Sequence, residues 1–132
     1  GYDVVIHPGS GGRKKNWSFE RFRDLASLLE EQERKVTWCV GPAEEESGHC
    51  DVSKNMLRCD SLVELAGELA GAKLYIGNDS GISHLAASLG VRTVALFGAT
   101  DPAVWTPLGR HVTVVGGMNE WPTFDEVVTA VG

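Results

Sequence analysis

The stretch KLYIGNDSGISHLAASLGVRTVALFG (residues 73–98) decides the fold. It begins with a short apolar run, continues through a polar turn into an amphipathic segment that stops at Gly90, and ends with a second apolar run. Short apolar runs rich in Val, Ile and Leu are typical of buried strands, and apolar residues at helical spacing predict a helix between them. Strand, helix and strand in this order predict a parallel α/β unit.

The same alternation covers the rest of the chain. Strands are expected at residues 3–7, 35–40, 55–59, 73–77, 92–98 and 111–115, and helices at about 18–32, 43–49, 61–71, 81–90 and 124–131. Ser61 with Glu64 and Thr123 with Glu126 match the S/T-x-x-E capping box that begins a helix. Near-continuous apolar strands are typical of a sheet covered on both faces. The sequence therefore predicts an α/β fold, a doubly wound parallel sheet.

Two helices carry apolar residues at a spacing that predicts which face is buried. In the first helix, which Ser18 is expected to cap, the apolar positions are Phe22, Leu25, Ala26 and Leu29. In the segment from Gly81 to Gly90 the expected buried stripe is Ile82, Leu85, Ala86 and Leu89. Gly81, His84 and Ser88 then share a different face of that helix, and His84 lies in its first turns.

Composition excludes several classes of protein. The chain has 132 residues, the size of one domain, with 42% hydrophobic residues and a net charge of −6. Because basic residues do not dominate this acidic chain, nucleic acid or an anionic membrane is not expected as its main partner, although a local site can still bind a small anion. No apolar run approaches the roughly 20 residues of a membrane span. Cys39, Cys50 and Cys59 form no C-x-x-C pair, which favours reduced thiols in a cytoplasmic protein over a metal site.

The loop HPGSGGRKKNWS (residues 7–18) follows the first strand. Its glycines allow a ligand to approach the backbone, Ser10 offers a hydroxyl, and Arg13, Lys14 and Lys15 form a positive cluster before a helix. This chemistry suits a phosphate or diphosphate, and a solvated turn is the alternative. The loop matches neither the G-x-x-x-x-G-K-[ST] motif nor the G-x-G-x-x-G motif.

Two further loops follow strands and carry polar residues. Asp79 or Ser80 can cap the helix after the fourth strand, and Gly81 leaves backbone N–H groups uncovered for an anion. The alternative for Asp79 is a plain helix cap, and the alternative for His84 is a histidine that bonds to a neighbour in its own helix. After the second strand, Glu44 to Glu46 either complement a helix dipole or accept hydrogen bonds from ribose hydroxyls. Ligands of such sheets bind at the carboxyl ends of the strands.

With these loops assembled, the chain resembles the C-terminal domain of glycosyltransferase family 9, the ADP-heptose:lipopolysaccharide heptosyltransferases. The resemblance rests on HPGSGGRKKNWSFERFRDLA (7–26), AGAKLYIG (70–77) and GNDSGISHLAASLGVRTVALFGATDPAVW (77–105). Its most specific element is D-[ST]-G-x-x-H, here Asp79 to His84. The resemblance implies a Rossmann-like lobe of a type-B glycosyltransferase that binds the nucleotide-sugar donor, with residues 1–132 as that domain and the N-terminal lobe absent from this chain.

The resemblance also implies a role for each site residue. Ser10, Gly11 and Lys15 would hold the diphosphate, and Ser80 and Gly81 would contact it through a hydroxyl and a backbone N–H. Asp79 would bind heptose hydroxyls with His84 close by, and Glu44, or else Glu45, would bind the ribose. No metal or cofactor is implied beyond the ADP-heptose donor.

The rest of the reaction is expected outside this chain. By the resemblance, the general base and most of the site for the lipopolysaccharide-core acceptor belong to the N-terminal lobe, so no catalytic residue is assigned here. The sequence begins at Gly1 without an initiator Met or signal peptide, which we interpret as a part of a longer chain. The whole protein is expected in the cytoplasm, or at the inner face of the cytoplasmic membrane.

Two other functions remain open from the sequence alone. One is a stand-alone nucleotide-binding or regulatory module of flavodoxin-like shape. A receiver-type module of that kind would need an acidic cluster after the first strand, where this chain has HPGSGG. The other is a different nucleotide-sugar enzyme, such as another type-B glycosyltransferase or an epimerase, which would place different residues around the diphosphate.

Overall fold

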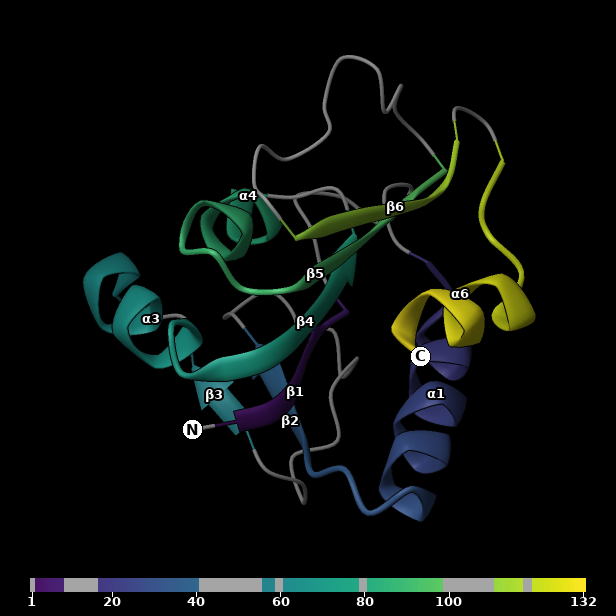
Figure 1. Cartoon of the computed structure of the whole chain (residues 1–132), viewed down its shortest axis with the longest axis horizontal. Coiled ribbons are helices and arrows are strands. Elements are labelled where there is room, and N and C mark those ends of the chain that lie inside the picture. The colour runs from purple at the N-terminus through teal and green to yellow at the C-terminus, as the bar shows by residue number, and fades with distance from the viewer. Residues whose placement is uncertain are drawn as a thin grey trace.

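The computed structural model describes residues 2–8, 17–40, 56–58, 61–78, 81–98, 111–117 and 120–132. The elements are β1 (Tyr2–His7), α1 (Phe19–Glu31), β2 (Val36–Val40), β3 (Met56–Arg58), α3 (Leu62–Leu69), β4 (Ala72–Asn78), α4 (Gly81–Ser88), β5 (Thr93–Phe97), β6 (Val112–Gly116) and α6 (Phe124–Val131) (Figure 1). These bounds confirm the predicted strands and four of the predicted helices. The helix expected at residues 43–49 lies outside the described residues.

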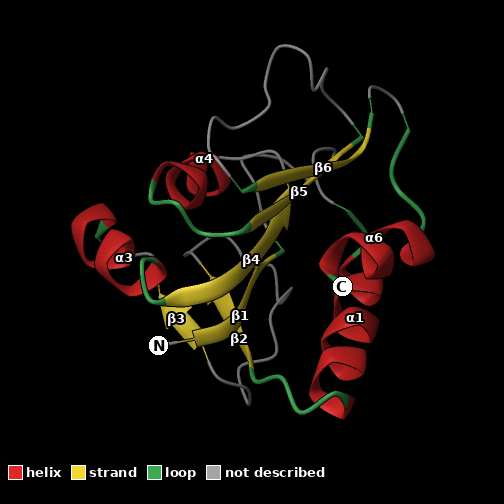
Figure 2. Cartoon of the chain, in the orientation of Figure 1, coloured by secondary structure: helices red, strands yellow, loops and turns green. Residues whose placement is uncertain are grey.

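The strands form one parallel sheet with the order β3-β2-β1-β4-β5-β6. Figure 2 shows helices on both sides of this sheet, with α1 and α6 on one side and α3 and α4 on the other. The predicted doubly wound parallel sheet is therefore confirmed. The order reverses direction between β1 and β4, because the chain builds outward from β1 to β3 and then returns to the other side of β1.

Alternate residues of the central strands enter two separate cores. Val4 and Ile6 point into the core beneath α1 and α6, whereas Val5 points into the core beneath α3 and α4. On β4, Leu74 and Tyr75 divide in the same way. Strands with a core on each face need apolar residues at every position, which explains the continuous runs in the sequence.

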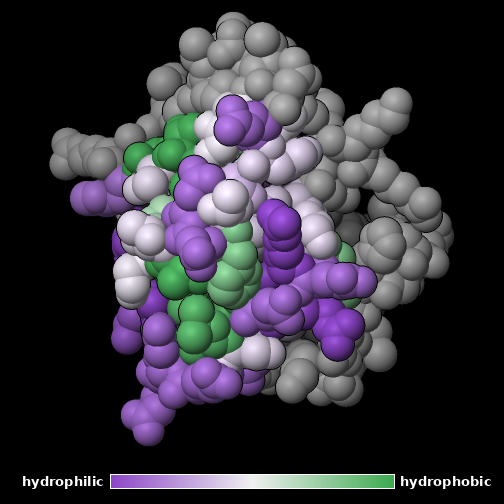
Figure 3. Space-filling view, turned by 90° about the vertical axis from the view of Figure 1, so that its right-hand side faces the viewer, coloured by the Kyte–Doolittle hydropathy of each residue, from purple (hydrophilic) through white to green (hydrophobic). Residues whose placement is uncertain are grey.

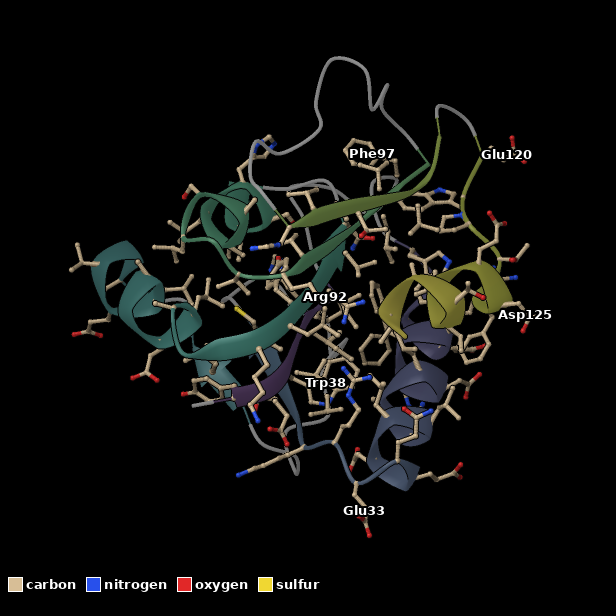
Figure 4. All side chains as sticks on the ribbon, in the orientation of Figure 1. Glu33, Trp38, Arg92, Phe97, Glu120 and Asp125 are labelled. Atoms are coloured by element: carbon tan, nitrogen blue, oxygen red, sulfur yellow. The ribbon has the colours of Figure 1, made fainter. Side chains whose placement is uncertain are left out.

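The core beneath α1 and α6 is rich in aromatic side chains. Trp38 points from the sheet toward α1 (Figure 4), where its ring lies 5.9 Å from that of Phe19, centroid to centroid.

Arg92 extends toward α6 in Figure 4, and its Nη2 donates to the carbonyl of Ala130 at 3.0 Å. On the outside of this layer, hydrophobic side chains form limited patches among hydrophilic ones (Figure 3).

The predicted helix starts and buried faces are partly confirmed. Phe22, Leu25, Ala26 and Leu29 are the buried residues of α1. The second capping box forms completely, since Thr123 and Glu126 each accept a hydrogen bond from the other's backbone N–H, at 3.2 and 3.1 Å. Ser61 Oγ accepts from the N–H of Glu64 at 3.4 Å. Ser18 is the N-cap residue of α1, as predicted, but its side chain makes no capping hydrogen bond.

The predicted buried face of α4 is also wrong in part. Its buried residues are Ser83, Ala86 and Ala87, whereas Leu89 is 38% exposed. Small side chains let this helix approach the sheet closely, so the larger Ile82 and Leu85 are only partly buried, against the core beneath α3 and α4. Leu89 lies in the turn after the helix ends at Ser88, so the helical spacing no longer applies to it. As predicted, Gly90 ends this segment, with a left-handed φ of +81°.

Candidate functional site

The candidate site lies where the strand order reverses, at the carboxyl ends of β1 and β4. His7 pairs in register with Gly77, so the two strands end side by side. Pro8, directly after β1, is the last described residue before the segment 9–16, and Asn78, at the end of β4, is the last described residue before residues 79–80. The chain therefore enters the basic loop and the D-S-G turn from neighbouring points on one edge. Ligands of doubly wound sheets bind at this position.

The side chain of Asn78 joins Pro8, which follows β1, to Trp17, which precedes α1. Asn78 is the last residue of β4 and is 0% exposed. Its Oδ1 accepts a hydrogen bond from the backbone N–H of Trp17 at 2.8 Å, and its Nδ2 donates to the carbonyl of Pro8 at 3.0 Å. Pro8 and Trp17 are the two residues that flank the segment 9–16. One buried amide thus holds both ends of the basic loop against the end of β4.

Trp17 fixes its end of the loop in the core. The side chain is 2% exposed, its ring packs edge-on against Phe22 at a centroid distance of 4.9 Å, and its Nε1 donates to the carbonyl of Pro122 at 2.9 Å. Trp17, the first described residue after the segment 9–16, is therefore anchored both by packing and by hydrogen bonds.

Further polar side chains lie buried beneath the switch in strand order. Ser83 Oγ donates to the carbonyl of Asn78 at 2.5 Å and lies 3.1 Å from the hydroxyl of Tyr75. The Tyr75 hydroxyl lies 3.3 Å from His7 Nδ1. A Cβ at Gly77 would lie 2.6 Å from this hydroxyl, so glycine is needed for the tyrosine to extend along its own strand. These contacts tie β1, β4 and the first turn of α4 into one polar cluster.

The comparison with known families decides what this arrangement belongs to. The family model described as glycosyltransferase family 9 (heptosyltransferase) matches residues 2–130. The chain belongs to glycosyltransferase family 9. The predicted family resemblance is thereby confirmed over nearly the whole chain.

Members of the family resemble this chain in sequence and in structure. Lipopolysaccharide heptosyltransferase 3 of Escherichia coli is 27% identical over 135 residues, which cover 94% of this chain and 39% of that protein. The structure of the E. coli heptosyltransferase WaaC with ADP has a TM-score of 0.84 and 29% identity, covering 99% of this chain and 43% of that one. The structure of WaaC with ADP-2-deoxy-2-fluoro heptose has a TM-score of 0.82, also with 29% identity, covering 99% and 42%. The chain thus spans less than half the length of these family members.

Two of the predicted site residues of this family member are described by the structure. Gly81 is the exposed first residue of α4, and a Cβ built on it meets no described atom within 4 Å. His84 follows one turn later and is half-buried. Both lie directly after β4, at the switch in strand order, as the sequence predicted. The other predicted site residues lie outside the described residues: Ser10, Gly11, Lys15, Glu44, Asp79 and Ser80.

Sequence reasoning missed the role of Asn78 and of its buried neighbours. The sequence showed Asn78 only as the first member of a polar run before a helix. Its signal is an amide side chain at the end of an otherwise apolar strand, where a buried polar group needs a partner. Which partners it has depends on Pro8 and Trp17, which are distant in sequence and become neighbours only in the fold.

Groups with a shifted pKa lie at the opposite end of β1. Tyr2 donates a hydrogen bond to the carboxylate of Glu68 at 2.5 Å, and this bond raises the pKa of the Tyr2 hydroxyl. The backbone N–H of Lys35 donates to the Asp3 carboxylate at 3.1 Å and, together with the ammonium of Lys73, lowers the pKa of Asp3. These shifts arise from contacts that join β1 to its neighbours, away from the candidate site.

The described residues contain neither a metal-binding cluster nor a membrane-spanning helix. Within it, His, Cys, Asp and Glu side chains form no group of three or more that could hold a metal ion. None of its helices is both long enough and apolar enough to cross a membrane.

Proposed function

We propose that this chain is the donor-binding lobe of a heptosyltransferase that transfers heptose from ADP-heptose to the inner core of lipopolysaccharide. The observation that carries the proposal is the reversal of strand order between β1 and β4, which brings the two ends of the basic loop beside the start of α4. Family membership supports the reaction class. The two similar WaaC structures, one with ADP and one with ADP-2-deoxy-2-fluoro heptose, support the identity of the donor.

In this proposal the predicted residues divide the donor between them. Ser10, Gly11 and Lys15 bind the diphosphate from one loop, and Ser80 and Gly81 bind it from the other. Asp79 binds heptose hydroxyls with His84 beside it, and Glu44 binds the ribose. Glu45 is the alternative for the ribose.

The chemical reason for this arrangement lies in the leaving group. As the glycosidic bond of the donor breaks, negative charge develops on ADP. The ammonium of Lys15 and the backbone N–H groups at the start of α4, where the helix dipole is positive, are suited to stabilise that charge. The chain supplies charge stabilisation in this way and needs no metal ion for it.

The proposal places the remaining parts of the reaction in a second, N-terminal lobe. That lobe would supply the general base and the site for the lipopolysaccharide-core acceptor, and the whole protein would work in the cytoplasm or at the inner face of the cytoplasmic membrane. The 132-residue chain is then expected to bind donor weakly and to transfer no heptose by itself.

Calorimetric titration of the chain with ADP, UDP and GDP, together with a transfer assay, tests the proposal. We expect ADP to bind more tightly than the other two nucleotides, and no transfer from ADP-heptose to a lipopolysaccharide-core acceptor. Tighter binding of UDP or GDP would favour a different type-B glycosyltransferase. Robust transfer by this chain would show that the active site is not shared with a second lobe, and no binding of any nucleotide would overturn the donor-binding role.

A further inference from the structure

We infer that Asn78 is a positioning residue for the donor diphosphate, because its side chain sets the distance between the two ends of the basic loop. The inference rests on the proposed function for the identity of the ligand. The hydrogen bonds themselves are independent of any ligand: Asn78 bonds to Trp17 at 2.8 Å and to Pro8 at 3.0 Å.

The side chain of Asn78 matches its two partners in chemistry as well as in position. The backbone N–H of Trp17 is a donor and the carbonyl of Pro8 is an acceptor, and an amide offers one acceptor and one pair of donors. An aspartate at this position would present a second oxygen to the Pro8 carbonyl, and a leucine would bond to neither group. Among side chains of this length, only asparagine satisfies both ends of the loop at once.

Burial makes this clamp stronger than a surface contact. Asn78 is 0% exposed, and Trp17 is 2% exposed. A buried N–H or carbonyl that loses its partner keeps the full cost of its desolvation, so opening the clamp is unfavourable at both ends. The clamp itself is held from the other side, because Ser83 in the first turn of α4 donates to the backbone carbonyl of Asn78.

The clamp therefore couples two parts of the proposed diphosphate site. One residue connects the ends of the loop that carries Ser10 and Lys15 to the helix that begins with Gly81. Fixing Pro8 and Trp17 before the ligand arrives limits the freedom of the segment between them and so removes part of the entropy cost of binding, and the clamp is therefore expected to act on affinity for the diphosphate.

The test compares Asn78→Ala with Thr93→Val, a matched control at the opposite end of the sheet. Thr93 is also 0% exposed, and its Oγ1 donates to the carbonyl of Val91 at 2.9 Å, away from both loops. Both variants therefore delete buried hydrogen bonds between a side chain and the backbone, two for Asn78→Ala and one for Thr93→Val. Two measurements are made on each variant and on the unaltered chain: the calorimetric affinity for ADP, and the rate of trypsin cleavage after Arg13, Lys14 or Lys15, followed by mass spectrometry without ligand.

We expect Asn78→Ala to accelerate cleavage within the loop and to weaken ADP binding, each by about tenfold or more, the size of effect that two lost hydrogen bonds produce. Thr93→Val should change the cleavage rate and the ADP affinity by less than about twofold each. The hydrogen bond that it removes lies away from both loops, and distant sites act independently. Equal effects of the two variants would mean that Asn78 only stabilises the fold and would overturn the inference. Faster cleavage with unchanged ADP affinity would also overturn the positioning role.

The outcomes separate this inference from the proposed function. If the unaltered chain binds no ADP, the donor-binding proposal fails, and the positioning role fails with it, while the cleavage rates still show whether Asn78 anchors the loop. If Asn78→Ala does not fold, hydrogen exchange of the Trp17 amide in the unaltered chain decides. Exchange as fast as in an unfolded peptide would contradict the clamp, and strong protection would support it.

Discussion

The two ends of strands β1 and β4 hold the molecule together by different chemistry. At the carboxyl end, polar contacts are buried: Asn78 and Ser83 are both 0% exposed, and their bonds join Pro8, Trp17 and α4 to the end of β4. At the amino end, polar contacts lie at the surface, where the Lys73 and Asp3 side chains of one ion pair are 82% and 39% exposed. Solvent screens the surface contacts, whereas the buried ones are costly to lose.

The contrast between the two ends separates the proposed function of this chain from its stability. The amino end joins strands to neighbouring elements with contacts that can be changed at little cost. The carboxyl end holds its loops with contacts that cannot be changed singly without leaving a buried group unpaired. The proposed donor site uses the end at which geometry is most strictly fixed, as expected for a site that must be ordered before its ligand binds.

The largest expected effect is on stability, from Trp17→Ala at the carboxyl end. This change removes a side chain that packs against Phe22 and bonds to Pro122, so the free energy of unfolding should fall by about 3–5 kcal/mol, as for other buried aromatic residues. Urea unfolding measures the change. Val63→Ala is the control, because that side chain is 83% exposed and its loss should alter stability by less than about 0.5 kcal/mol. Similar losses from both changes would contradict the anchoring role of Trp17.

The next effect is on donor binding, from Lys15→Ala. A charge-assisted contact with a diphosphate contributes roughly 1.5–3 kcal/mol, so ADP affinity should fall by about 10- to 150-fold. Lys14→Ala is the matched control from the same loop and should have less effect if its side chain faces solvent. Calorimetric titration with ADP measures both. Small and equal losses would indicate that the loop is a solvated turn that binds no phosphate.

A smaller effect on transfer, without a change in stability, is expected from Asp79→Asn in the full-length enzyme. Asparagine caps a helix about as well as aspartate, so the melting temperature should stay nearly constant. The charged acceptor for sugar hydroxyls is lost, which should slow transfer by about tenfold or more. Melting temperature and turnover are measured on the same preparation. Normal turnover with lowered stability would show that Asp79 serves the helix and not the donor.

His84→Ala extends this test to the second turn of α4. His84 is half-buried, whereas the buried residues of this helix are Ser83, Ala86 and Ala87. The packing of α4 against the sheet should therefore survive the change. Turnover should fall, whereas the melting temperature should change little. The opposite result would place His84 among the residues that hold α4 on the sheet.

These comparisons also show what the sequence could and could not predict. The strands, the parallel sheet and the α1 stripe from Phe22 to Leu29 follow from local patterns, as does the complete capping box of Thr123 and Glu126. The buried face of α4 does not, because the sheet selects the small Ser83, Ala86 and Ala87 over the larger apolar residues. The clamp of Asn78 does not either, since its partners are 61 and 70 residues away along the chain.

The smallest effect is expected at the amino end, from Asp3→Asn. The folded chain lowers the pKa of Asp3, chiefly through the N–H of Lys35 and also through Lys73. A carboxylate with a lowered pKa stabilises the fold above its pKa in the unfolded chain, near 3.8, and this contribution disappears as the pH falls through the lower pKa of the folded state.

In the Asp3→Asn variant, asparagine can still accept a hydrogen bond from the backbone N–H of Lys35 but carries no charge. The variant should therefore melt slightly below the unaltered chain at pH 7, and the two melting temperatures should converge as the pH falls below 3.8. Because the pair is exposed, added salt should also reduce the difference at pH 7. A difference in melting temperature that persists unchanged at low pH would show that the charge of Asp3 is not its cause, and a loss as large as that of Trp17→Ala would contradict the contrast between the two ends of the sheet.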